Sequence, residues 1–307
     1  MRDKCDREIK HIRLSVTPKC SYNCLYCDSE GFSPEKNVLT VEEITELSHL
    51  LAKILNVSRI KLTGGEPLCR KEIIQIIKNI KNLGLYNDIS MTTNGFRLGE
   101  MAQDMADVGL DRVNVSLCSL NPKTYERITG VNGLKEVLRG LKAAKEAGLS
   151  PIKINFVIMK GLNANEFDDM IEFCGENGYI LQLIELHKES DAIERDNGKF
   201  YDKYHKEVIP IIENLEKKAL ETIVRDNMQN RKIFVMPNNT VIETVVPSHE
   251  FCMGCTKLRV GCDGRIFGCL FRSDLGQNVK KELHNHCTIS KFRKIVQEVV
   301  DSREPYY

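Results

Sequence analysis

The stretch Arg13–Cys27, RLSVTPKCSYNCLYC, decides the fold of this chain. Its first residues alternate in polarity as a β-strand does, and three cysteines follow with the spacing C-x3-C-x2-C. Thiolates at that spacing can hold three corners of a cubane iron–sulfur cluster and leave the fourth iron open, as catalytic metal centres require. The stretch therefore predicts a [4Fe-4S] cluster on Cys20, Cys24 and Cys27. A zinc site would need a distant histidine as its fourth ligand.

The first strand belongs to a repeating pattern of strands and amphipathic helices. The predicted strands are His11–Thr17, Ser58–Thr63, Asp88–Thr93, Arg112–Leu117, Pro151–Ile158 and Tyr179–Glu185. Between two of them, Leu134, Val137, Leu141 and Ala144 follow the helical period. Strands separated by helices form a parallel sheet through right-handed crossovers.

One face of this sheet is predicted to be polar and basic. Arg13, Lys61, Ser90, Asn114 and Lys153 each alternate with apolar neighbours. A complete eight-stranded barrel fills its interior with branched apolar side chains, so a polar interior favours an incomplete barrel around a charged ligand. The alternative is an antiparallel sheet with one solvated face.

The pattern changes after residue 190, so we expect a barrel domain over residues 1–190 and a C-terminal region over residues 191–307. That region has too little apolar sequence for a core of its own and is expected to close the barrel. Its predicted elements are a linker over 188–203, a helix over 201–220, strands over 233–236 and 241–246, and a helix over 289–300.

A second cysteine triplet lies in the C-terminal region. Cys252, Cys255 and Cys269 have the spacing C-x2-C-x13-C and predict a second iron–sulfur cluster. Cys262 lies between them, and the spacing leaves open whether it is a fourth ligand. Without it, this cluster would also keep an open iron.

Composition sets limits on the function. The chain has 307 residues, twelve cysteines and a formal net charge of +1. No apolar run is long enough for a membrane helix or a signal peptide, and the near-neutral charge argues against a broad nucleic-acid surface. We expect a cytoplasmic protein without membrane or nucleic-acid partners, in which clustered cysteines bind metal rather than form disulfides.

The spacing of the first triplet resembles that of the radical S-adenosylmethionine (SAM) superfamily. The resemblance implies an incomplete (β/α)6 barrel of the α/β class, with SAM bound at the open iron of the first cluster. The segment Gly64-Gly65-Glu66-Pro67 after the second strand resembles the superfamily segment beside the methionine amino group. The SAM-binding residues that the resemblance implies are Tyr26, Gly65, Glu66, Ser116 and His187.

From about residue 9 to residue 272 the chain resembles one family within that superfamily, the GTP 3′,8-cyclases of molybdenum cofactor biosynthesis. The motifs are RLSVTPKCSYNCLYC, LTGGEP, TTNG, RVNVSL, ERITG, PIKINFV, FCMGCTKLR and CDGRIFGCLF. The resemblance implies that GTP binds between two [4Fe-4S] clusters. The GTP-binding residues it implies are Arg13, Lys61, Thr92, Lys153, Lys257 and Arg259.

The implied reaction begins with a 5′-deoxyadenosyl radical from SAM, which abstracts the 3′ hydrogen of GTP. Carbon C3′ then joins C8, and the product is 3′,8-cyclo-7,8-dihydro-GTP. The implied partners are a one-electron reductant of the ferredoxin or flavodoxin type and the downstream cyclic pyranopterin monophosphate synthase. Both a monomer and a homodimer are compatible with the sequence.

The chain departs from the family pattern at three places. Gln182 stands where the family usually has an arginine, and His187 stands where it has a methionine that contacts SAM. The chain ends in Arg303-Glu304-Pro305-Tyr306-Tyr307 instead of a Gly-Gly tail that reaches the active site. Arg303 is the residue that could reach inward in place of that tail.

Two other functions compete with the cyclase. A peptide-modifying radical SAM enzyme with an auxiliary cluster would share both triplets, but it would not need a ring of phosphate-binding cations. An iron–sulfur electron carrier or a zinc-structured binding module would have closed sites with four ligands and would not cleave SAM.

Overall fold

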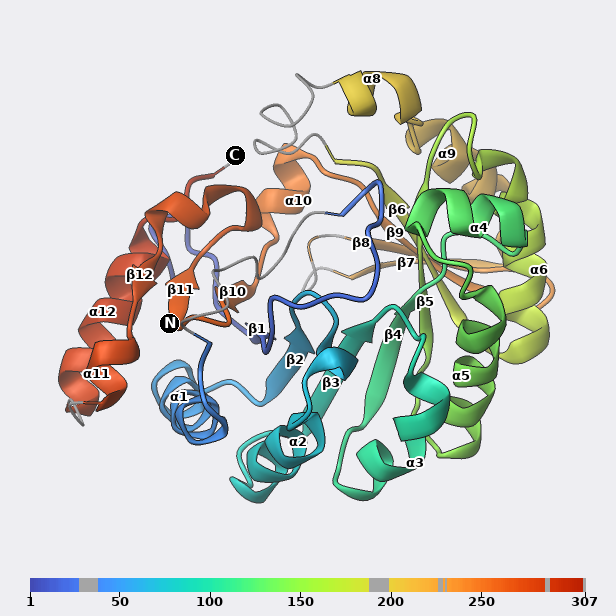
Figure 1. The fold of residues 1–307 in the computed structure, drawn as a ribbon. Coiled ribbons are helices and arrows are strands. Elements are labelled where there is room, and N and C mark those ends of the chain that lie inside the picture. Colours follow the sequence, from blue (N-terminus) through green and yellow to red (C-terminus); the bar gives the residue numbers. More distant parts are fainter. Residues whose placement is uncertain (28–37, 188–198, 226–228, 230, 285–287, 306–307) are drawn as a thin grey trace.

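The computed structural model describes residues 1–27, 38–187, 199–225, 229, 231–284 and 288–305. Six parallel strands form the middle of its sheet, in sequence order (Figure 1). They are β1 (His11–Ser15), β2 (Arg59–Thr63), β3 (Asp88–Thr93), β4 (Arg112–Ser116), β5 (Lys153–Ile158) and β6 (Ile180–Glu185). The predicted strands are confirmed to within two residues, and the antiparallel alternative is wrong.

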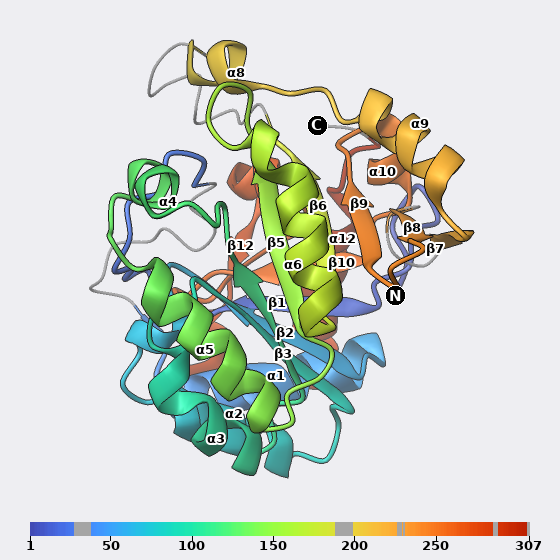
Figure 2. The same cartoon turned by 90° about the vertical axis from the view of Figure 1, so that its right-hand side faces the viewer.

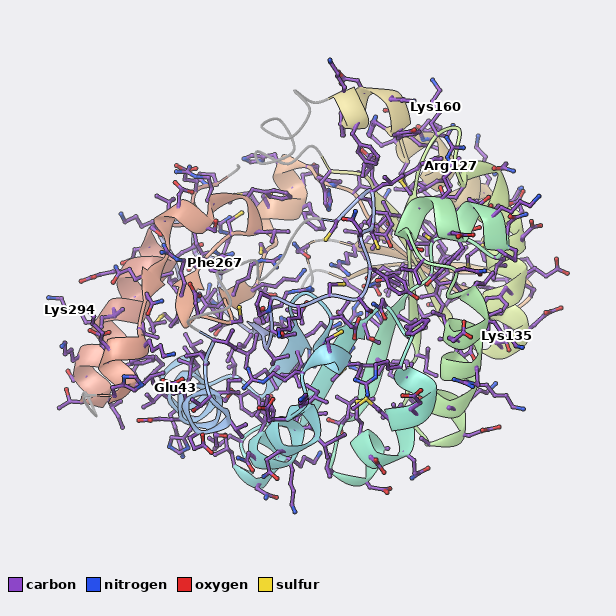
Figure 3. All side chains as sticks on the ribbon, in the orientation of Figure 1. Glu43, Arg127, Lys135, Lys160, Phe267 and Lys294 are labelled. Atoms are coloured by element: carbon purple, nitrogen blue, oxygen red, sulfur yellow. The ribbon has the colours of Figure 1, made fainter. Side chains whose placement is uncertain are left out.

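Helices cover the outer face of these strands, as Figures 1 and 2 show. They are α1 (Val41–Leu55), α2 (Ile73–Asn82), α3 (Leu98–Asp107), α4 (Pro122–Thr129), α5 (Leu134–Glu146) and α6 (Phe167–Asn177). Helix α1 begins with a capping box, in which the Thr40 and Glu43 side chains accept hydrogen bonds from each other's backbone N–H groups. Charged side chains such as Lys135 on α5 project outward (Figure 3).

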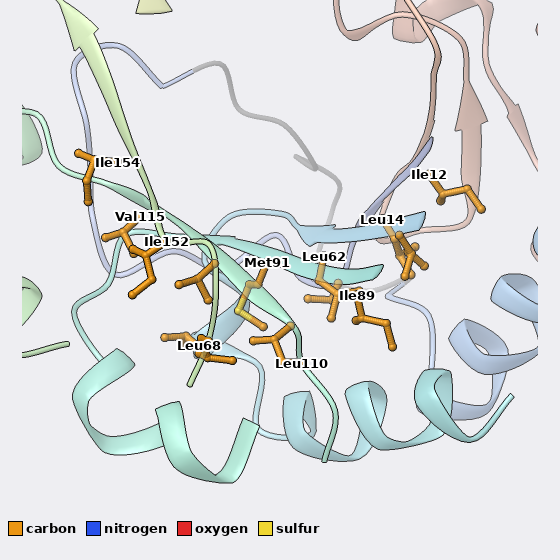
Figure 4. Packing of buried hydrophobic residues seen from close by; sticks show 14 of the residues in the cluster. Ile12, Leu14, Leu62, Leu68, Ile89, Met91, Leu110, Val115, Ile152 and Ile154 are labelled. Carbon is orange, nitrogen blue, oxygen red and sulfur yellow. The ribbon is translucent and has the colours of Figure 1, made fainter. Parts of the chain in front are cut away.

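The apolar core lies between the sheet and these helices. Every second residue of a strand points to this face, among them Ile12 and Leu14 on β1, Leu62 on β2, Met91 on β3 and Val115 on β4 (Figure 4). Each of the five is at most 1% exposed. Because the apolar residues point to the helices, the polar residues between them are left on the opposite, concave face.

The C-terminal region adds strands to both edges of this sheet instead of forming a core of its own. Strand β9 (Val241–Val245) pairs parallel with β6, and β10 (Lys257–Val260) pairs parallel with β1. The sheet therefore has twelve strands among the described residues. The outer strands are β8 (Arg231–Val235) and β7 (Glu221–Arg225) beyond β9, and β11 (Arg265–Phe267) and β12 (Gln277–Asn278) beyond β10.

The helix predicted over residues 201–220 is wrong as a single element. The structure has α8 (Lys199–Tyr204) and α9 (Ile209–Lys218) with a break between them. Pro210 has no N–H group and lies in the first turn of α9, where that group is not needed. In the break, the Glu185 carboxylate accepts a hydrogen bond from the Val208 N–H, which fixes the start of the second helix.

The C-terminal region also contains four helices, the first of which carries Cys252. They are α10 (His249–Met253), a 3-10 helix over Leu270–Leu275, α11 (Lys280–His284) and α12 (Ile289–Asp301). The last predicted helix, over 289–300, is confirmed. The linker predicted over 188–203 lies mostly outside the described residues, and the domain boundary near residue 190 stays a prediction. None of the described helices combines the length and the apolar composition of a membrane span.

Candidate active site

The concave face of the sheet lines a cavity of about 580 Å³. The polar face predicted from strand alternation is confirmed, since Arg13, Lys61, Ser90, Asn114 and Lys153 all line this cavity. Both cysteine triplets line it too, as do all the residues predicted to bind SAM or GTP. The structure therefore brings every predicted site residue to one cavity, while the ligand of each residue stays a prediction.

Strand register arranges the cations of this face in a row. Arg259 on β10 is the cross-strand neighbour of Arg13 on β1, and Arg13 is the neighbour of Lys61 on β2. Lys61 donates a hydrogen bond of 2.7 Å to Asn114, and Asn114 donates one of 3.2 Å to Asn155. This row and its hydrogen-bonded extension cross from β10 to β5.

The loop with the first triplet runs from the end of β1 and is fastened to α4. The Asn23 and Leu25 N–H groups donate to the carbonyl oxygens of Thr129 and Ile128, at 3.1 and 2.9 Å. Cys20 and Cys27 are exposed, and Cys24 is partly buried. Burial raises the pKa of the Cys24 thiol to about 12, and the neighbouring Cys27 and Cys20 add to the effect, so a bound cation would favour the Cys24 thiolate.

Gly64 and Gly65 let the backbone after β2 approach this loop. A Cβ atom on Gly64 would lie 2.4 Å from the Thr17 carbonyl oxygen, and one on Gly65 would lie 2.4 Å from that of Lys19. The Gly65 and Glu66 N–H groups donate to the same two carbonyls. The close contacts of both glycines are therefore with the segment that leads to Cys20.

Glu66 is buried, and its carboxylate has several partners in the protein. It accepts hydrogen bonds from the Leu68 N–H, the Thr93 hydroxyl and the Asn94 N–H, at 3.0, 2.7 and 2.6 Å. Burial nevertheless raises the pKa of this carboxyl. Glu66 therefore ties the end of β2 to the end of β3 at the cavity wall, and its contact with an ammonium group stays a prediction.

The loop with the second triplet is held by arginines from both ends of the chain. Arg7 donates a hydrogen bond of 3.0 Å to the Cys252 carbonyl oxygen, and Arg303 donates one of 2.6 Å to that of Cys255. Both guanidinium groups lie against the buried Asp3 carboxylate, at 2.7 and 3.1 Å. Arg303 is also among the residues that line the cavity.

The charges around Cys255 favour a thiolate. Burial alone would raise the pKa of this thiol, but the Lys257 and Arg303 cations outweigh burial and lower it. Cys262 differs, because it is fully buried and is not among the residues that line the cavity. Burial raises the pKa of the Cys262 thiol to about 11. The position of Cys262 favours a second cluster held by three cysteines.

The donor arrangement also bears on the type of metal centre. Among the described residues, no three His, Cys, Asp or Glu side chains converge on a point where one metal ion could bind. A mononuclear zinc site requires such convergence, whereas a cubane cluster binds each thiolate at a different iron. The metal centre that each triplet binds stays a prediction.

Sequence reasoning missed the groups that surround Lys153. Its ammonium forms an ion pair with Glu243 on β9, which also faces Arg225 on β7 and Arg231 on β8. Arg225 and Arg231 line the cavity together with Lys153. The signal was present, since Glu243 is a lone acidic residue inside the apolar run of residues 241–246.

Gln182 and His187, two of the departures from the family pattern, both line the cavity. Gln182 is 7% exposed and is the cross-strand neighbour of Glu243. Burial, with the nearby cations Lys257 and Arg259, lowers the pKa of His187 to about 4, so its imidazole is neutral at neutral pH. Its ring packs edge-on against Phe271 with 5.7 Å between the ring centres.

Two protein families match the chain. Residues 14–174 match the radical SAM superfamily, and residues 179–307 match the Molybdenum Cofactor Synthesis C family. SuiB from Streptococcus suis, bound to S-adenosylmethionine, has a TM-score of 0.67 at 15% identity over 98% of this chain and 76% of that chain. AnSMEcpe with bound AdoMet and Cp18Cys peptide has a TM-score of 0.59 at 15% identity, over 94% of this chain and 84% of that chain. At this identity the likeness shows a common fold alone.

Curated relatives match over the full length. A probable GTP 3′,8-cyclase of Thermococcus kodakarensis is 42% identical over 99% of both chains. Others of the same name are 39% identical in Methanothermobacter thermautotrophicus and 41% in Methanococcus aeolicus, each over 100% of this chain and 99% of theirs. The chain belongs to the radical SAM superfamily and, within it, to the GTP 3′,8-cyclase family of molybdenum cofactor biosynthesis.

Proposed function

We propose that this protein converts GTP into 3′,8-cyclo-7,8-dihydro-GTP for molybdenum cofactor biosynthesis. One observation carries the proposal beyond family membership: both cysteine triplets and a row of cations line a single cavity of about 580 Å³. A nucleoside triphosphate needs cations for its phosphates and, for radical chemistry, a site enclosed enough to exclude side reactions.

The cofactors follow from the donor sets. Cys20, Cys24 and Cys27 would hold a [4Fe-4S] cluster whose open iron binds SAM, with Tyr26, Gly65, Glu66, Ser116 and His187 around SAM. Cys252, Cys255 and Cys269 would hold a second [4Fe-4S] cluster on the opposite side of the substrate. When bound, the first cluster and SAM supply the radical that takes the ribose 3′ hydrogen.

The chain itself binds and orients the substrate. Arg13 is the cross-strand neighbour of both Arg259 and Lys61. The three charges therefore lie along one wall of the cavity, where they would bind the phosphates together. Thr92, Lys153 and Lys257 complete the set from the same cavity. A hydrogen bond from a charged donor contributes about 1.5–3 kcal/mol, which is enough to fix the ribose relative to the radical.

The reaction also implies partners. A one-electron reductant of the ferredoxin or flavodoxin type would supply electrons, and a cyclic pyranopterin monophosphate synthase would use the product. We place the reaction in the cytoplasm, where free thiols stay reduced and available to clusters.

The test uses the anaerobically reconstituted enzyme with dithionite, SAM and GTP that carries deuterium at C3′. We expect deuterium in the 5′-deoxyadenosine, measured by mass spectrometry. Deoxyadenosine without deuterium would keep the radical SAM chemistry but move the substrate away from GTP. The peptide-modifying alternative predicts that second result.

A further inference from the structure

A buried carboxylate that faces three cations lies at the β9 side of the cavity. Glu243 is 1% exposed and is paired with Lys153, while Arg231 and Arg225 lie 3.2 and 3.6 Å from its other oxygen. Burial opposes its ionisation, but Lys153 and Arg231 outweigh burial and lower the pKa of Glu243 to about 2. One anion therefore faces three cations, and positive charge is left over.

The hydrogen bonds of Arg231 are incomplete. Its Nη1 donates to Glu243 at 3.2 Å, and its Nη2 donates to Gln229 at 3.0 Å. Its Nε is buried and has no hydrogen-bond partner among the described residues. A buried donor without an acceptor is costly, and native structures supply one from protein, water or a ligand.

Gln229 connects this arginine to the predicted substrate site. The same Gln229 oxygen accepts a hydrogen bond of 2.7 Å from Lys257. The ring centre of Phe251, the residue before Cys252, lies 6.0 Å from the guanidinium carbon of Arg231. Arg231 thus lies between Glu243 and the loop of the second triplet, and it lines the cavity beside Gln229 and Cys252.

We propose that Arg231 is a substrate-binding residue that donates from Nε to the polyphosphate of the nucleoside triphosphate, while Glu243 and Gln229 hold its other two nitrogens in place. The proposal rests on GTP being the substrate. Arg231 keeps a buried Nε–H group without an acceptor among the described residues, and it belongs to a group of charges in which cations outnumber carboxylates. The polyphosphate supplies both the missing acceptor and the missing negative charge.

The experiment measures binding by anaerobic calorimetry on the reconstituted enzyme, without SAM or reductant, for GTP and for guanosine. The variants are Arg231→Gln, Arg231→Lys and the matched control Lys232→Gln. Lys232 follows Arg231 on β8 but is paired with Glu216, and both side chains are about two-fifths exposed. Circular dichroism and iron content verify that each variant is folded and loaded.

We expect Arg231→Gln to raise the Kd for GTP ten- to a hundredfold, as the loss of a charge-assisted hydrogen bond implies. The Kd for guanosine should change by less than twofold. Arg231→Lys keeps the charge but loses the planar guanidinium, so its Kd for GTP should lie between those of the wild type and Arg231→Gln. The Kd of Lys232→Gln should match that of the wild type. If Arg231→Gln does not fold, Arg231→Lys provides the test, because it retains the ion pair with Glu243. It must still raise the Kd for GTP more than the Kd for guanosine.

An unchanged Kd for GTP in Arg231→Gln, or an equal loss of affinity for GTP and for guanosine, would overturn the role of Arg231. Neither result would contradict the cyclase function. Wild-type enzyme that binds guanosine and GTP equally would instead contradict the phosphate site as a whole. The two failures are therefore distinguishable.

Discussion

The guanidinium of Arg303 donates a hydrogen bond of 2.6 Å to the carbonyl oxygen of Cys255. A residue from the last turn of the chain thus fastens the loop of the second cysteine triplet. The fit is close, because a Cβ atom on Gly268 would lie 2.3 Å from Cγ of Arg303. Asp3 completes the arrangement from the N-terminal segment.

Replacement of Arg303 by methionine should destabilise the protein. Asp3, whose side chain is 0% exposed, would lose one of its two cationic partners, at a cost of about 3 kcal/mol. Thermal unfolding monitored by circular dichroism measures the effect, and iron content should fall as the Cys255 loop loosens. Arg293→Gln on α12, at an exposed position, is the control. Equal melting temperatures for the two variants would contradict this prediction.

Gly65→Ala should impair loading of the first cluster. The new methyl group would lie 2.4 Å from the Lys19 carbonyl oxygen, so the segment that leads to Cys20 must move. We expect a lower iron content after reconstitution, with the second triplet still loaded. Gly84→Ala is the control, because nothing lies within 4 Å of its added Cβ, although its φ of +66° adds strain. Normal iron content in Gly65→Ala would disprove the packing argument.

Cys262→Ala should retain the iron content of the wild type. The side chain is fully buried and does not line the cavity, so its loss removes a small apolar group rather than a ligand. The expected cost is about 1 kcal/mol of stability. Iron analysis of Cys262→Ala beside Cys255→Ala provides the comparison, and a similar loss of iron in both would make Cys262 a ligand.

GTP binding should take up protons. Burial, and then the Arg112 and Arg13 cations, hold the pKa of Lys61 well below its usual range, and a polyanion beside it would raise that pKa again. Calorimetry at pH 8 in buffers of different ionisation enthalpy measures the uptake, which Lys61→Met should reduce. Binding heats that do not depend on the buffer would refute this.

Most of the central fold could be predicted because strand alternation and helix period are local signals. The inward direction of Arg13, Lys61 and Lys153 followed from period two alone. The family resemblance added the ligands that these residues are proposed to bind. The pairing of β9 and β10 with the edges of the barrel depends on contacts across the whole chain, which no local pattern encodes.

The ion pairs of Glu243 also depend on tertiary contacts that no local sequence pattern encodes. Arg225 and Arg231 are cross-strand neighbours on β7 and β8, and in the sequence each alone reads as a surface charge. Only tertiary structure places both against Glu243 and Lys153. The break before Ile209 has a simpler explanation: a single helix over residues 201–220 would contain Pro210, and proline is tolerated in the first turn of a helix, where it lies in α9.

The pairing of β1 with β10 has a consequence for synthesis. His11 and Lys257 are aligned neighbours, although residues 12–256 lie between them in the sequence. During synthesis, one edge of β1 stays unpaired until the C-terminal third of the chain has left the ribosome. An unpaired edge can form hydrogen bonds with other chains. High contact order also slows folding. We therefore expect nascent chains that stop before residue 257 to depend on chaperones, because the strand that begins the protein is completed by one of the last to be made.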